Sequence, residues 1–305
     1  MATKSTNALF EKFKLVYYPL RNSPFIHKYI LNFINVANWV LLKRTYKKNS
    51  TLISRRIIFD LNTQGIAFSN LDEIFPDGNL LNEMQEWVVN NEKNLYPKAK
   101  KKFLLSYFGS EDDLVELDIS NPFFKFYLNH KIIFLVNSYL GYTPQLNYVS
   151  VEKTIPVEKD MGPSHSQNWH RDPEEKRMIK VFIYINEVNE RNGPFVYVKH
   201  SQPSGKSTLS KFAPQKLPYG SYPDEKSVSS KVKDKDLITA IGKAGTVIFC
   251  DTAGLHRGGL SFSGERIMAT GFYPSKKWTE PSLIHIPANL DKKSLNSLAI
   301  QILKK

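Results

Sequence analysis

After Gly141, short runs of apolar and β-branched residues alternate with turn-forming Gly, Asn and Pro. Strands of this length with turns between them are typical of an antiparallel sandwich or barrel. We expect strands at Gln145–Ile155, Met178–Ile185, Phe195–Val198, Thr246–Cys250 and Ile267–Tyr273. Residues 200–243 interrupt the pattern as a polar insertion rich in Ser, Lys and Pro, and so long a loop is usually functional or mobile.

Before Gly141, apolar residues recur mostly at helical spacing. This periodicity predicts helices at 8–18, 25–48, Asp77–Asn91 and Asn121–Leu140. Pro19 and Pro24 separate the first two, and Gly141 ends the last. Arg56–Phe59 and Gly65–Phe68 are expected to form short strands. The chain therefore predicts a mainly β domain with flanking helices.

Charge is distributed unevenly along the 305 residues, whose formal net charge is +13. Residues 1–56 contain eleven Lys or Arg and one acid and so carry +10, which leaves +3 for the rest. We expect a basic helical segment at 1–56 followed by one domain at 57–305. This asymmetry favours a polyanionic partner, such as a membrane surface, a nucleic acid or an anionic substrate.

Composition excludes several other classes. A chain that is 41% hydrophobic and 23% charged, with Cys250 as its single cysteine, is neither disordered, collagen-like nor a disulfide scaffold. The lone cysteine favours a reducing compartment. The longest apolar stretch, Tyr29–Leu42, has 14 residues, whereas a membrane-spanning helix needs about 20. We expect a cytoplasmic protein, and peripheral contact through an interfacial helix stays open.

The candidate chemistry begins at His170-Arg171-Asp172. On a strand, residues two apart project to the same face, so His170 and Asp172 can offer an imidazole and a carboxylate to one metal ion. Two histidines and one carboxylate form the facial triad of non-haem Fe(II) oxygenases, which leaves three coordination positions open. Such a site needs a second histidine from a later strand and a cation for the far carboxylate of 2-oxoglutarate.

The sequence offers both. His256 follows the apolar run that ends at Asp251, 84 residues after Asp172, and Arg266 lies ten residues beyond His256. Arginine suits the second role because its planar guanidinium can bind a carboxylate through two parallel hydrogen bonds.

At this point the chain resembles the phytanoyl-CoA dioxygenase-like family of Fe(II)/2-oxoglutarate oxygenases. The similarity lies in Gln167-Asn-Trp-His-Arg-Asp172, in Asn192–Ser201, in Gly245–Arg266 and in the opening run Gly65-Ile-Ala-Phe-Ser-Asn-Leu. It spans roughly residues 60–275. The resemblance implies a double-stranded β-helix, a jelly-roll or cupin-like core, with helices around it.

The resemblance also implies the roles of single residues. His170, Asp172 and His256 would bind Fe(II), and Arg266 would pair with the C5 carboxylate of 2-oxoglutarate. O₂ and 2-oxoglutarate would be the cosubstrates, with succinate and CO₂ as products and hydroxylation as the usual outcome. A small or a lipid- or glycan-linked substrate, which the basic segment suggests is anionic, would fit. In the family the strand before His170 supplies a polar contact to the cosubstrate, and four residues are candidates for it here: Ser150, Glu152, Lys153 and Thr154. The register of this strand stays open, because a slip of one residue exchanges its two faces.

Several alternatives stay open. Family members often carry Ser and Asn between the distal histidine and the arginine, where this chain has Gly258, Gly259 and Ser261. Trp169 is a core residue or a substrate platform. The fold could serve as a non-catalytic binding module, or the oxygenase could act on nucleic acid, although no nucleic-acid motif is present.

Overall fold

The computed structural model describes residues 50–98, 101–109, 113–158, 162–203, 205, 223–275 and 282–303. The helices expected at 8–18 and 25–48 lie outside these residues. None of the described helices is both long and apolar enough to cross a membrane.

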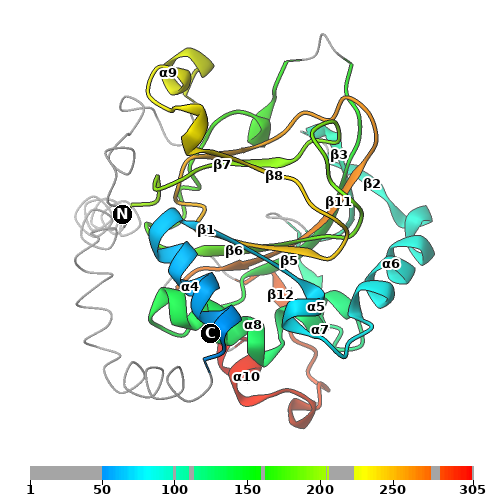
Figure 1. Ribbon diagram of the computed structural model, residues 1–305. Helices are drawn as coiled ribbons and strands as arrows, with labels where there is room; N and C mark the ends of the chain where they lie inside the picture. The colour runs from blue at the N-terminus through cyan, green and yellow to red at the C-terminus, as the bar shows by residue number, and fades with distance from the viewer. Residues whose placement is uncertain are drawn as a thin grey trace, which may run out of the picture.

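A seven-stranded sheet forms the larger layer of the domain, with the strand order β1-β9-β6-β11-β5-β3-β2 (Figure 1). All neighbouring strands in it are antiparallel. The strands are β1 (Ile66–Asn70), β2 (Tyr96–Lys98), β3 (Lys101–Phe108), β5 (Tyr148–Thr154), β6 (Ile179–Tyr184), β9 (Thr246–Cys250) and β11 (Arg266–Tyr273).

A three-stranded antiparallel sheet, β10-β7-β8, faces the larger one. It consists of β7 (Phe195–Val198), β8 (Leu237–Ala240) and β10 (His256–Gly258). A buried cluster joins the two sheets, with Phe182 and Ile248 from the larger sheet against Phe195 and Tyr197 from the smaller one. The architecture is the double-stranded β-helix, as the sequence predicted.

Helices cover the opposite face of the large sheet (Figure 1). They are α4 (Leu52–Gln64), α5 (Leu71–Ile74), α6 (Leu80–Asn90), α7 (Pro122–Tyr127), α8 (His130–Leu140) and α10 (Ser297–Leu303). Alternate residues of β6 serve the two faces: Ile179, Val181 and Ile183 pack in the helical core, and Phe182 and Tyr184 face the small sheet. This two-residue period follows from the pleat of a strand.

The remaining elements are short. They are β4 (Val115–Glu116) and β12 (Ile284–His285), which pair in parallel, the helix α9 (Glu225–Ser229), and the 3-10 turns η2 (Glu92–Asn94), η3 (His165–Gln167), η5 (Asp234–Asp236) and η6 (Lys292–Ser294).

The strands predicted after Gly141 are confirmed, and β7 and β9 have the predicted bounds. The strand predicted at Arg56–Phe59 is wrong, because these residues lie inside α4. Thr51 and Ser54 form a capping box at the start of α4, and Gly65 ends it with φ 83°. Local capping therefore outweighs the β propensity of Ile57 and Ile58. The boundary expected between 56 and 57 falls within this helix, and the division into segment and domain stays a prediction.

The single helix predicted at Asn121–Leu140 is in fact two, α7 and α8, with a break at Leu128 and Asn129. Asn129 accepts a hydrogen bond from the Lys131 amide and so begins a new helix. The predicted terminator Gly141 is confirmed, with φ 79°. Among the described residues the prediction missed the strands β2, β3, β4, β8, β10 and β12. Of these, β8 lies within the insertion at 200–243.

Candidate active site

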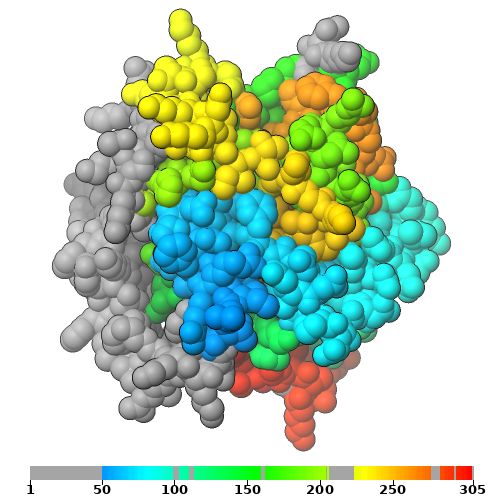
Figure 2. Space-filling model, viewed as in Figure 1, coloured from blue at the N-terminus to red at the C-terminus, as the bar shows by residue number. Residues whose placement is uncertain are grey.

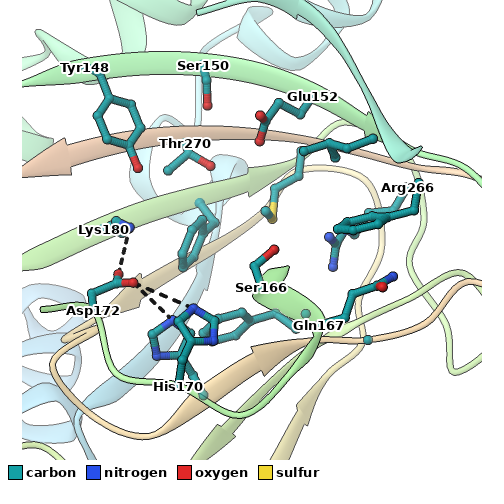
Figure 3. A pocket seen from close by; sticks show the side chains of 18 residues that line it. Tyr148, Ser150, Glu152, Ser166, Gln167, His170, Asp172, Lys180, Arg266 and Thr270 are labelled. Atoms are coloured by element: carbon teal, nitrogen blue, oxygen red, sulfur yellow. Dashed lines mark ion pairs between the residues drawn. The ribbon is translucent and has the colours of Figure 1, made fainter. Parts of the chain in front are cut away.

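A cavity of about 140 Å³ lies between the two sheets, next to His170, Asp172 and His256 (Figure 3). The large sheet provides one wall through Ser150, Glu152, Lys180, Met268 and Thr270. Ser166 and Gln167 of η3, with Gly258 of β10, lie on the opposite side. Arg266 lines the cavity as well.

The two histidines are brought together by main-chain pairing. His170 and His256 form an antiparallel bridge in which the amide of each donates to the carbonyl of the other, both at 2.9 Å. Their rings lie 4.2 Å apart between centroids. The imidazole Nδ1 of His170 is 2.8 Å from the Asn168 carbonyl, and that of His256 is 2.9 Å from the Gly254 carbonyl. Because a carbonyl only accepts, each Nδ1 carries a proton, and Nε2 is the ring nitrogen that faces Asp172 in both residues.

Asp172 completes the group. Its Oδ1 is 3.7 Å from Nε2 of His170 and 3.7 Å from Nε2 of His256. One donor atom from each of the three residues lies within 4.8 Å of the others, close enough for one metal ion. No second group of three such donors comes together among the described residues. Two neutral imidazole nitrogens and one carboxylate oxygen are a donor set that suits non-haem Fe(II).

Electrostatics keep these donors ready for a metal. Burial alone would raise the pKa of Asp172. The positive charge of Lys180, together with the neighbouring His256 and His170, outweighs the effect of burial and holds that pKa well below its usual range. Burial, with His170 beside it, lowers the pKa of His256 to about 3. At neutral pH Asp172 is therefore ionised and His256 is neutral, the forms in which both bind metals.

Lys180 is a site residue that the sequence reading missed. It lies on β6, and its Nζ is 2.7 Å from Oδ2 of Asp172 (Figure 3). The available signal was a single charge in the otherwise apolar run Ile-Lys-Val-Phe-Ile-Tyr. Because lysine is almost never fully buried unless it is paired, a lysine within a buried strand indicates an anionic partner.

Arg266 is the first residue of β11 and is buried. It donates from Nη1 to the Gly193 carbonyl and from Nη2 to Oγ1 of Thr154 at 3.1 Å, while its Nε has no hydrogen-bond partner among the described residues. Burial lowers the pKa of Arg266, with Tyr184 acting in the opposite direction. A buried cation with an unsatisfied donor beside a cavity is suited to an anionic ligand.

The structure also settles the register of the wall that faces the ligands. Thr154 is paired with Arg266, and Ser150 with Thr270. Ser150 and Glu152 line the cavity, and Thr154 touches it through Arg266. Lys153 lies on the other face of β5, where it pairs with Glu92 and Glu265. Of the four candidates named from sequence, Lys153 is therefore not a cavity residue.

Gln167 was also missed. Its Oε1 accepts from the Ser164 amide in a capping box, whereas its Nε2 is buried without a partner. The neighbouring Ser166 extends its hydroxyl into the cavity (Figure 3). The capping pattern accounts for Oε1 of Gln167, but no sequence pattern indicated that Nε2 lies beside the cavity.

Four further residues with polar or aromatic side chains lie outside the group of candidate metal ligands. Trp169 is buried, its Nε1 donates to Glu225 at 3.0 Å, and Arg257 stacks on its ring at 4.4 Å, so it is a packing residue. His165 and His200 do not join the ligand cluster. Arg171 donates to two carbonyls, those of Ser201 and Ala253, and so ties loops together.

The sequence model of the family described as phytanoyl-CoA dioxygenase (PhyH) matches residues 76–266. The chain therefore belongs to the phytanoyl-CoA dioxygenase family, and it is an Fe(II)/2-oxoglutarate-dependent oxygenase. The comparison with curated proteins gives no match.

Solved structures share the fold. EctD from S. alaskensis with bound Fe is 16% identical, with a TM-score of 0.50 over 77% of this chain and 82% of that one. EctD with 2-oxoglutarate and 5-hydroxyectoine is 14% identical, with a TM-score of 0.50 over 78% and 89%. AviO1 from Streptomyces viridochromogenes Tue57 is 13% identical, with a TM-score of 0.50 over 76% and 100%. At these identities the likeness shows the fold alone.

Proposed function

We propose that this chain hydroxylates its substrate, with His170, Asp172 and His256 as the ligands of Fe(II). The observation that carries the proposal is the convergence of their three donor atoms within 4.8 Å beside a cavity. When bound there, Fe(II) supplies oxidation by O₂ coupled to conversion of 2-oxoglutarate into succinate and CO₂. The protein contributes by presenting deprotonated ligands and by positioning both substrates.

Arg266 is proposed to bind the C5 carboxylate of 2-oxoglutarate. Its Nε lacks a hydrogen-bond partner in the part of the chain that the structure describes, and Thr154 helps to hold the guanidinium in place. The buried Nε2 of Gln167 and the hydroxyl of Ser166 line the same cavity as Arg266. These donors offset the absence of side chains at Gly258 and Gly259, which lie on the same wall.

The substrate is proposed to be polar where it reacts. Ser150 and Thr270 are paired on neighbouring strands, and both line the cavity with Tyr148 and Glu152 (Figure 3). The cavity of about 140 Å³ would also have to hold 2-oxoglutarate, so we expect it to admit a small substrate or the reacting part of a larger one. This supports a small molecule or the head of a lipid- or glycan-linked one.

Peripheral contact with an anionic membrane surface is proposed for the N-terminal side. Residues 1–56 carry +10. The helix α4, blue in Figure 2, lies at the surface. Its Leu52 and Phe59 are 84% and 66% exposed, and Arg55 and Arg56 of the same helix are exposed too. An apolar and basic helix face of this kind favours an anionic interface. Vesicle sedimentation tests this: Leu52→Ser/Phe59→Ser should bind phosphatidylserine vesicles more weakly than the unaltered chain. Equal binding by both would contradict it.

Turnover of 2-oxoglutarate to succinate tests the function itself. The Fe(II)-loaded chain in air should form succinate, and His170→Ala should not. His200→Ala is the matched control, because His200 bonds the Thr63 carbonyl outside the ligand group and should leave turnover intact. A chain that binds Fe(II) and 2-oxoglutarate but forms no succinate with any substrate would favour the binding-module alternative.

A further inference from the structure

Lys180 is a charged residue in the middle of the larger sheet. Its strand β6 lies between β9 and β11, and all six residues of β6 are buried. Placing an ammonium group there is unfavourable unless an anion neutralises it. The neutralising group is Asp172, one of the three candidate metal ligands.

Three contacts fix the ammonium group. Nζ lies 2.7 Å from Oδ2 of Asp172, 5.3 Å from the ring centroid of Phe272 and 5.9 Å from that of Tyr148. Both rings are within the range of a cation–π interaction. Lys180 is thus held by its aromatic neighbours, independently of the metal group, and presents its charge to one oxygen of Asp172.

The two oxygens of Asp172 are consequently not equivalent. Oδ2 faces Lys180, whereas Oδ1 faces Nε2 of both histidines at 3.7 Å. We propose that Lys180 is a positioning residue that engages Oδ2 of Asp172, so that the carboxylate offers a single oxygen, Oδ1, to the metal. This inference rests on the proposed function, because it assigns Lys180 a role in the same site.

The number of oxygens that Asp172 offers to a metal determines how many coordination positions stay open. Two imidazoles and one carboxylate oxygen leave three of six positions open, enough for a bidentate 2-oxoglutarate and one O₂. A carboxylate that chelated through both oxygens would take one of those positions. The ion pair also neutralises Asp172 before a metal arrives, so the fold does not have to bury an isolated carboxylate.

Metal binding by the whole chain without oxygen tests the proposal. Lys180→Met removes the charge and keeps the length of the side chain. Lys153→Met is the matched control, since Lys153 is a second buried, ion-paired lysine in the same sheet, but its partners are Glu92 and Glu265. The measurements are the affinity for Co(II) by calorimetry and the visible Co(II) spectrum, which reports coordination number.

Loss of an outer partner of a metal ligand usually lowers metal affinity by about 10- to 100-fold. We expect that loss in Lys180→Met together with a changed Co(II) spectrum, and neither effect in Lys153→Met. Should Lys180→Met fail to fold, Lys180→Gln decides, with an expected loss of about tenfold. Unaltered affinity and spectrum in the folded variant would overturn the role of Lys180 alone. An unaltered chain that bound no Co(II) would overturn the proposed function with it.

Discussion

His170 and His256 exchange both main-chain hydrogen bonds across one antiparallel bridge, each at 2.9 Å. Main-chain hydrogen bonds therefore hold the two candidate ligands opposite each other, although 86 positions separate them in sequence. Their Nδ1 atoms are also held by main-chain carbonyls. The ligand geometry thus belongs to the folded chain and does not depend on a metal to create it.

Hydrogen exchange on the metal-free chain tests this preorganisation. The amides of His170 and His256 should exchange slowly, because each donates to the carbonyl of the other across their antiparallel bridge. Fast exchange at both histidines that slowed only after metal was added would show that the metal assembles the site.

Arg266→Lys should weaken 2-oxoglutarate binding. Lysine keeps the charge but loses the planar fork, so a carboxylate loses at least one charged hydrogen bond, which corresponds to about a tenfold or greater rise in Kd. Calorimetric titration with 2-oxoglutarate in the presence of Mn(II) measures it. Arg257→Lys is the control, because Arg257 pairs with Glu225, and it should leave Kd unchanged. Equal Kd for both variants would remove Arg266 from the cosubstrate site.

Two adjacent glycines should respond differently to alanine. A Cβ at Gly258 would meet the Ser166 carbonyl at 3.5 Å, an ordinary contact, whereas a Cβ at Gly259 would lie 2.5 Å from the Pro194 carbonyl. We expect Gly259→Ala to lower the free energy of unfolding by about 1–3 kcal/mol. Gly258→Ala should leave it unchanged or slightly raised. Urea denaturation measures both, and equal losses would contradict the packing described here.

Asp251 should make stability depend on pH. It is fully buried and accepts a 2.6 Å hydrogen bond from Tyr139. Burial raises its pKa from 3.8 to about 6, against the opposing effect of the Tyr139 hydrogen bond. Between these values the folded chain holds a proton that the unfolded chain has released. This contribution to stability is therefore complete below pH 4 and lost as the pH rises through 6.

The loss amounts to about 3 kcal/mol, from roughly 1.4 kcal/mol per pKa unit. The Asp251→Asn variant has no carboxyl to titrate, so it lacks this pH-dependent contribution to the free energy of unfolding. Urea denaturation from pH 4 to 8 should show the unaltered chain losing stability relative to the variant between pH 4 and 6. A difference between the two that did not vary with pH would contradict the raised pKa.

The ligand residues could be read from the sequence because their chemistry imposes a spacing. His170 and Asp172 lie two residues apart, and His256 and Arg266 follow after 84 and a further ten residues, in an order that resembles that of the family. The same logic located β7 and β9, whose apolar runs end at turn residues.

Lys180 and Gln167 could not be assigned in this way. Each acts through a partner that only the tertiary fold brings near: Asp172 for Lys180, and the cavity for Nε2 of Gln167. The strand predicted at Arg56–Phe59 failed for a related reason. Its β-branched residues bury one side of α4 against the helical core, and caps at both ends fix the helix.

Anaerobic titration of the Fe(II)-loaded chain with 2-oxoglutarate tests the iron site itself, because chelation of Fe(II) by the keto acid gives a visible charge-transfer absorption. We expect a saturable band in the unaltered chain, none in Asp172→Ala or His256→Ala, and an undiminished band in His200→Ala. No band in the unaltered chain, or an equal band in Asp172→Ala, would contradict the assignment of His170, Asp172 and His256 as the iron site.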